Sequence, residues 1–144
     1  MPNLHPFLTH FPIALLSLSI VSECAARILN REEFSRVGWW TQLAGTIGLA
    51  AAAVTGTLAG QSVEVVPAGK PYLEMHQEIA FVTLTVFAIL LFWRIASRTK
   101  RPPGHDMLFL VIFTGGVLAL WAGAWYGGEM VYRFGAGVQV PPVP

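Results

Sequence analysis

The sequence is poor in charged residues and has a single cysteine. Charged residues make up 12% of its 144 positions, about half of the roughly 25% typical of soluble domains. Long stretches contain almost no charge, which excludes a water-soluble enzyme, a nucleic-acid-binding protein and a disordered tail. The net charge of +1 gives no field that attracts polyanions. The lone Cys24 excludes an internal disulfide, a cysteine-based zinc site and a cysteine-ligated iron–sulfur cluster.

Hydrophobic residues, in contrast, account for 54% of the chain. A membrane-spanning helix needs about 20 mainly apolar residues. Four segments meet this requirement, at residues 7–29, 37–60, 75–96 and 107–131. Polar, proline-rich or glycine-rich connectors separate them. The sequence therefore predicts one all-α domain over residues 1–144, an integral membrane four-helix bundle with up-down topology.

The basic residues predict the orientation of this bundle. Both termini and the second connector are predicted to lie at one end of the bundle, and only two basic residues, Lys70 and Arg133, lie there. The others flank the first and third connectors: Arg27, Arg31, Arg36, Arg94, Arg98, Lys100 and Arg101. Because basic connectors stay in the cytoplasm, we expect both termini to lie outside. The chain is thus expected to be a multi-pass protein of the inner cell membrane.

Small residues recur at every fourth position of two predicted helices. The second helix has Ala44, Ala52 and the glycines Gly48, Gly56 and Gly60. The fourth helix has the same spacing at Gly115, Ala119, Gly123 and Gly127. Such a stripe most often marks a close contact between helices. Two stripes on alternate helices also favour a second interpretation, in which they leave room for a flat ligand between them.

Two of the four histidines are predicted to lie at matched depth near the outer end. His10 is about one turn inside the first helix, and His76 opens the third. In an up-down bundle these helices are diagonal, with axes roughly 11–14 Å apart. That gap suits two imidazoles pointing inward at a shared metal. Ionisable side chains within a span are functional candidates, although a histidine at a helix end is also explained by a hydrogen bond to a carbonyl or headgroup.

The other histidines are weaker candidates. His5 precedes Pro6 and is expected to be extended, just before the helix starts. It could fold back beside the site, join a metal or contact a quinone. His105 lies in a predicted cytoplasmic turn, where a solvated side chain is expected.

A haem between His10 and His76 would use both features of the sequence. Its edges would meet the glycines in the outer halves of the second and fourth helices: Gly56, Gly60, Gly123 and Gly127. Its propionates would point outward, toward Lys70, Tyr72, Tyr132 and Arg133. Each ligating imidazole also needs an acceptor for its second nitrogen, for which Thr9, Glu78 and Glu129 are candidates.

The segment Leu4-His5-Pro6-x-x-x-His10-Phe11-Pro12-Ile13 resembles the signature of domain of unknown function 2231, a family of small bacterial four-span membrane proteins. The resemblance covers nearly the whole chain and includes His76 and the closing Gly127-Gly128…Tyr132…Gly135. It implies the four-span fold. Similar domains occur joined to Rieske-type iron–sulfur modules, which points by association to redox work. Phe134 stands where family members often have a histidine.

These observations predict a membrane-embedded b-type cytochrome with one outer haem b, ligated by His10 and His76. It would carry single electrons between a quinone, or a partner such as a Rieske-type protein, and an outer acceptor. Two axial ligands favour electron transfer over catalysis. One alternative is a copper or zinc site built from His10 and His76, completed by His5 or by a carboxylate such as Glu74 or Glu129. Another is a scaffold subunit without redox function. The oligomeric state stays open, with a homodimer as one alternative.

Overall fold

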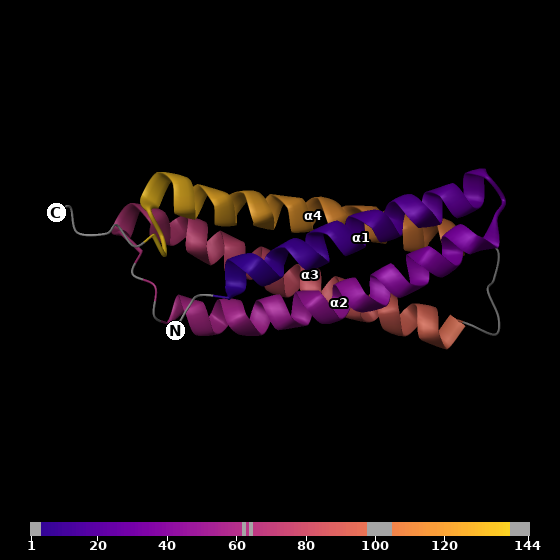
Figure 1. Ribbon diagram of the computed structural model, residues 1–144, viewed down its shortest axis with the longest axis horizontal. Coiled ribbons are helices and arrows are strands. Elements are labelled where there is room, and N and C mark those ends of the chain that lie inside the picture. Colours follow the sequence, from indigo (N-terminus) through magenta and orange to yellow (C-terminus); the bar gives the residue numbers. More distant parts are fainter. Residues whose placement is uncertain (1–3, 62, 64, 98–104, 139–144) are drawn as a thin grey trace.

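The chain folds into four long helices that run alternately up and down (Figure 1). The computed structural model describes residues 4–61, 63, 65–97 and 105–138, with the backbone alone for 105 and 106. The helices are α1 (His5–Ile28), α2 (Glu32–Gly60), α3 (Lys70–Ala96) and α4 (His105–Phe134), and a 3-10 turn, η1 (Pro67–Gly69), precedes α3. The predicted all-helical, up-down fold is confirmed.

All four helices are long and apolar enough to cross a bilayer. In the most apolar window of each, between 22% and 28% of the residues are buried inside the bundle. A bundle that is one helix thick on each side leaves most apolar side chains pointing outward. That arrangement is stable when the surrounding solvent is lipid.

Each helix packs most closely against its hairpin partner, α1 on α2 and α3 on α4. The contacts of α1 with α4 and of α2 with α3 are less extensive, so α1 and α3 lie on one diagonal, as the sequence predicts. The buried core is Leu16, Leu49, Phe87, Leu90, Phe113, Val117 and Leu120. This apolar layer fills the middle of the bundle and separates its two ends.

All four helices begin earlier than the sequence predicts. α2 starts at Glu32 rather than at residue 37, and α4 starts at His105, which the sequence placed in a turn, rather than at residue 107. α3 starts at Lys70 rather than at residue 75. α1 starts at His5, which the sequence placed before the helix. The reason is that Pro6 lies in the first turn, where its missing N–H has no helical acceptor to lose. His5 is therefore held on a rigid helix end.

A buried ion pair connects the two hairpins at the end of the bundle opposite His5. The Arg94 guanidinium of α3 donates to the Glu23 carboxylate of α1, and both residues are less than 10% exposed. Arg94 also donates to Gln42 Oε1 at 3.0 Å and to the Ser35 carbonyl at 3.0 Å, both on α2. Local spacing favours pairing of Glu23 with Arg27; the structure gives Glu23 a partner on another helix.

Removing one member of this pair should destabilise the bundle strongly. Arg94→Leu leaves the buried Glu23 without its guanidinium, a loss of about 3–5 kcal/mol for a broken buried pair. The swapped double variant Glu23→Arg/Arg94→Glu should recover about half of the loss, because the charges still face each other. The measurement is unfolding by sodium dodecyl sulfate in mixed micelles, followed by circular dichroism.

Arg133→Leu is the matched control. Arg133 pairs with Glu129 on α4, but its side chain is 61% exposed, so its removal should cost less than about 1 kcal/mol. Equal destabilisation by Arg94→Leu and Arg133→Leu would contradict a special role for the buried pair.

Candidate functional site

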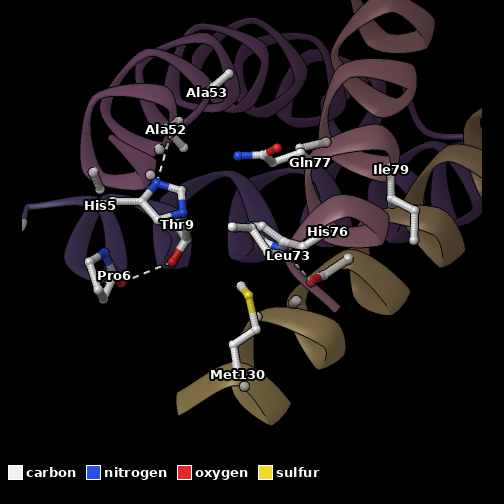
Figure 2. A pocket seen from close by; sticks show the side chains of 18 of the residues that line it. His5, Pro6, Thr9, Ala52, Ala53, Leu73, His76, Gln77, Ile79 and Met130 are labelled. Atoms are coloured by element: carbon white, nitrogen blue, oxygen red, sulfur yellow. Dashed lines mark hydrogen bonds between the residues drawn. The ribbon is translucent and has the colours of Figure 1, made fainter. Parts of the chain in front are cut away.

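A cavity of about 460 Å³ lies at the end of the bundle where α1 and α3 begin. All four helices line it, mainly with small and aliphatic residues such as Ala52, Ala53, Ile79 and Gly123 (Figure 2). Cofactor and ligand sites typically measure about 300–1,000 Å³ and are mostly apolar with a few polar groups. The polar residues that line this cavity include three histidines, His5, His10 and His76.

His5 of α1 and His76 of α3 meet across the diagonal of the bundle. Their ring centroids are 5.9 Å apart, and the ring planes are nearly perpendicular, at 79°. Both side chains are half-buried and line the cavity (Figure 2). The two helices that carry them are not sequence neighbours, so the contact depends on the complete bundle.

Each imidazole is held by a backbone carbonyl of the next helix. His5 Nδ1 lies 2.8 Å from the Ala52 carbonyl oxygen of α2, and His76 Nδ1 lies 2.7 Å from the Gly123 carbonyl oxygen of α4. A carbonyl can only accept, so Nδ1 donates its hydrogen in both rings. The neutral ring then carries its lone pair on Nε2. This is the tautomer, with the orienting bond, that metal-bound histidines commonly use.

Two glycines make these hydrogen bonds possible. A Cβ at Gly56 would lie 2.8 Å from His5 Cε1, and a Cβ at Gly127 would lie 3.2 Å from His76 Cε1. In a helix, the carbonyls of Ala52 and Gly123 lie one turn before these glycines. The absence of a side chain therefore exposes each carbonyl and lets the imidazole ring lie against the helix.

The two halves of the site are equivalent positions of an internal repeat. His5 and His76 are 71 positions apart, and so are Gly56 and Gly127. Each histidine reaches a carbonyl 47 residues further along the chain. The buried positions follow the same shift: Pro12, Leu16, Ser19 and Glu23 of α1 correspond to Thr83, Phe87, Leu90 and Arg94 of α3. The hairpins are thus related by an approximate two-fold axis along the bundle, and the cavity lies on it.

Comparison with known proteins assigns the family. The model of the family described as "Predicted membrane protein (DUF2231)" matches residues 1–140. The chain belongs to the DUF2231 family. No curated protein and no solved structure matches it. The resemblance inferred from the LHPxxxHFP segment is thereby confirmed, and the DUF2231 chain is a multi-pass membrane protein embedded in the lipid bilayer.

The structure separates the two histidines of the DUF2231 signature. His5 contacts His76, whereas His10 is exposed at the rim of the cavity and its Nδ1 donates to the Pro6 carbonyl of its own helix at 2.7 Å. Positions five apart on a helix point about 140° away from each other. The partner that the structure gives His76 is therefore His5 and not His10.

The other glycines predicted to border a haem, and the polar residues predicted near its propionates, differ in their surroundings. Gly60 faces Gln77, whose Nε2 would be 3.2 Å from a Cβ there, and a Cβ at Gly123 would touch Ile79 at 3.0 Å. Tyr132 lines the mouth of the cavity and is 90% exposed. Arg133 is 61% exposed and pairs with Glu129. The histidine acceptors expected among side chains are backbone carbonyls instead.

Sequence reasoning missed a further neighbour, Met130 of α4. It is 9% exposed, and Figure 2 shows its thioether pointing toward the imidazoles. A search for internal repeats would have identified His5, because a shift of 71 residues aligns it with His76 and aligns Gly56 with Gly127. Met130 has Ala59 at its equivalent position, so the same search gives no signal for it.

Adding a methyl group at Gly56 should displace His5 and weaken the fold. The Gly56→Ala Cβ would lie too close to the ring, and such overpacking typically costs about 1–3 kcal/mol. Gly115→Ala is the matched control, because a Cβ there meets nothing within 4 Å. Thermal unfolding in detergent, together with ¹⁵N histidine spectra, measures both effects. An unchanged His5 signal in Gly56→Ala would contradict the packing described here.

Proposed function

We propose that the protein is a membrane-embedded b-type cytochrome that holds one haem between His5 and His76 and transfers single electrons. The observation that supports this proposal is the contact between two imidazoles of diagonal helices, each in the tautomer that presents Nε2. This replaces the His10–His76 ligand pair favoured by the sequence pattern. Position 5 is where the structure brings an imidazole to His76.

The spacing of the rings supports a shared metal ion. An imidazole nitrogen binds a transition metal at about 2.0 Å, so two rings on opposite sides of one ion have centroids about 6.3 Å apart. The observed separation of 5.9 Å needs an adjustment of a few tenths of an ångström. Hydrogen bonds from Nδ1 to backbone leave the rings able to make this shift without a change of rotamer.

The cavity supports a flat organic cofactor over a bare ion. A volume of about 460 Å³ is far more than one metal ion occupies. A disc lying between the rings would extend toward α2 and α4, where Ala52, Ala53, Gly123 and Gly127 line the cavity. A porphyrin supplies four nitrogen ligands itself, so two histidines complete six-coordinate iron.

Copper is the second candidate, and Met130 favours it. A thioether is a soft ligand that prefers Cu(I), and Met130 points at the histidine pair (Figure 2). Among the side chains that the structure describes, no three His, Cys, Asp or Glu residues gather at one point. Two histidines and a methionine suit cuprous copper better than zinc, which usually takes four N, S or O ligands.

The surrounding residues would determine which reaction a bound haem supports and which side of the membrane it faces. A haem held by both His5 and His76 would have no open position for oxygen, which favours electron transfer over oxygen chemistry. The apolar core on the far side of the cavity, with Leu49 and Leu120 at its border, keeps water out. From the distribution of basic residues, we infer that the cavity faces the outer side of the inner membrane. An outer partner such as a Rieske-type protein would then reach its mouth.

Haem binding should depend on His5 and His76. Protein purified from haem-supplied cells should show the sharp α-band of a reduced, low-spin b-type haem. His5→Ala and His76→Ala each remove one axial ligand and should abolish this band or convert it to a high-spin form. Reduced-minus-oxidised absorption spectra and a haem assay per mole of protein measure both.

His10→Ala is the matched control, because His10 belongs to the same helix but its Nδ1 donates to the Pro6 carbonyl of that helix. Its spectrum should keep the low-spin band. A colourless wild-type protein that takes up no added haem would reject the cytochrome, and stoichiometric copper lost in Met130→Ala would establish the second candidate.

A further inference from the structure

The cavity reaches the outside of the bundle along two seams. His10 and Gly128 line it between α1 and α4, and Phe81 and Thr57 line it between α3 and α2. These pairs occupy equivalent positions in the internal repeat, since His10 and Phe81, and likewise Thr57 and Gly128, are 71 residues apart. The two-fold axis thus gives two equivalent seams at the edge of the cavity, one between α1 and α4 and one between α2 and α3.

The α1/α4 seam is open where the α2/α3 seam is filled. A Cβ placed at Gly128 would meet nothing within 4 Å. At the equivalent place on α2, Thr57 has a side chain, and α3 has the larger Phe81 where α1 has His10. On its inner side the α1/α4 seam is closed by a 3.0 Å hydrogen bond from Trp121 Nε1 to Ser17 Oγ. The opening is therefore local, about two helical turns from this closure.

Near the opening lie the His10 imidazole on α1 and, on α4, a stripe that includes Trp125, whose ring contacts that of Tyr126. Trp121, Trp125 and Gly128 follow one stripe of α4, at the i, i+4 and i+7 positions. Trp125 is 53% exposed on this stripe. His10 is on the neighbouring helix, α1. A flat ring of modest size would find an aromatic surface, the space over Gly128 and one polar group.

The tautomer of His10 selects the kind of polar group that binds there. Its Nδ1 donates to the Pro6 carbonyl, so the neutral ring accepts through Nε2. His10 lies about 7 Å along α1 from the start of the helix, near the border of the hydrocarbon layer. An imidazole at this depth is costly unless a polar partner meets it. The fitting partner is a lipid-resident molecule with a hydroxyl donor.

We propose that this opening binds the head group of a lipid-soluble hydroquinone. One ring hydroxyl donates to His10 Nε2, the ring lies over Gly128 beside Trp125, and the isoprenoid tail extends into the bilayer. The role of this site rests on the proposed function, because a hydroquinone bound there would be an electron carrier at the edge of the haem cavity. An acceptor nitrogen favours the reduced, hydroxyl-bearing form over the quinone, whose carbonyls cannot donate.

The test follows the His10 imidazole directly. Full-length, ¹⁵N-histidine-labelled protein in phosphatidylcholine nanodiscs is titrated with tetramethylhydroquinone, kept reduced by ascorbate. The His10 Nε2 resonance, assigned with His10→Gln, should move in a saturable way. Gly128→Leu fills the opening and should raise the Kd at least about tenfold. Thr57→Leu introduces a leucine at the equivalent position of the other seam and should leave the Kd within about twofold.

A matched ligand isolates the hydrogen bond. The dimethyl ether of the same hydroquinone has the ring but no O–H, and should leave the Nε2 resonance unmoved. Equal shifts with the ether, equal effects of Gly128→Leu and Thr57→Leu, or no saturable shift would each overturn the proposal. The same shift produced by phosphatidylglycerol nanodiscs without hydroquinone would assign the opening to a lipid headgroup and also overturn it.

The absorption spectrum of each sample separates the two proposals. A His10 shift in protein that takes up no haem would keep the hydroquinone site and reject the cytochrome. A low-spin haem band with an unmoved His10 resonance would keep the cytochrome and reject the site.

Discussion

The hydrogen bonds from the Nδ1 atoms of His5 and His76 to backbone carbonyls are the constraint on which the site depends. Within a bilayer a polar N–H has few partners, and the nearest acceptors are the carbonyls of a neighbouring helix. Reaching them requires that helix to have no side chain in the way, hence Gly56 and Gly127. Once the Nδ1 hydrogens are bound, the Nε2 lone pairs and the ring positions follow from the packing of the helices.

At the charged end of the bundle, buried donors likewise find their acceptors on neighbouring helices. Arg94 has several donors, and they meet Glu23, Gln42 and the Ser35 carbonyl. Between this cluster and the histidines lies the apolar core. In the part of the chain that the structure describes, one group of polar side chains thus secures the contact between the hairpins and another borders the cavity.

Much of the architecture could be predicted from sequence, because bilayer thickness fixes the length of a span and four apolar runs have that length. The diagonal of α1 and α3 followed from the up-down topology. His76 was singled out as the residue that opens the third helix; the structure places it on the cavity, but six residues inside α3, which begins at Lys70. His5 was set aside because Pro6 suggests an extended backbone before it; a proline in the first turn is equally compatible with a helix that begins at His5.

The remaining features of the site depend on facts that local patterns do not contain. The acceptors of the imidazoles are main-chain oxygens, which every residue has, so no residue type marks them. The pairing of Glu23 with Arg94 joins residues on different helices and competes with the nearer Arg27. The placement of Met130 depends on the rotation of α4 about its own axis. Each of these requires the packed bundle.

The internal repeat has a consequence for the origin of the fold. One hairpin carries one imidazole, one glycine and one acceptor carbonyl, which is half of everything the cavity needs. Two identical copies of such a hairpin, meeting around a dyad, would already build a complete pocket at their interface. Joining the copies in tandem then frees each to change by itself, so a glutamate and an arginine at matching places can attract each other where a homodimer would have set like against like.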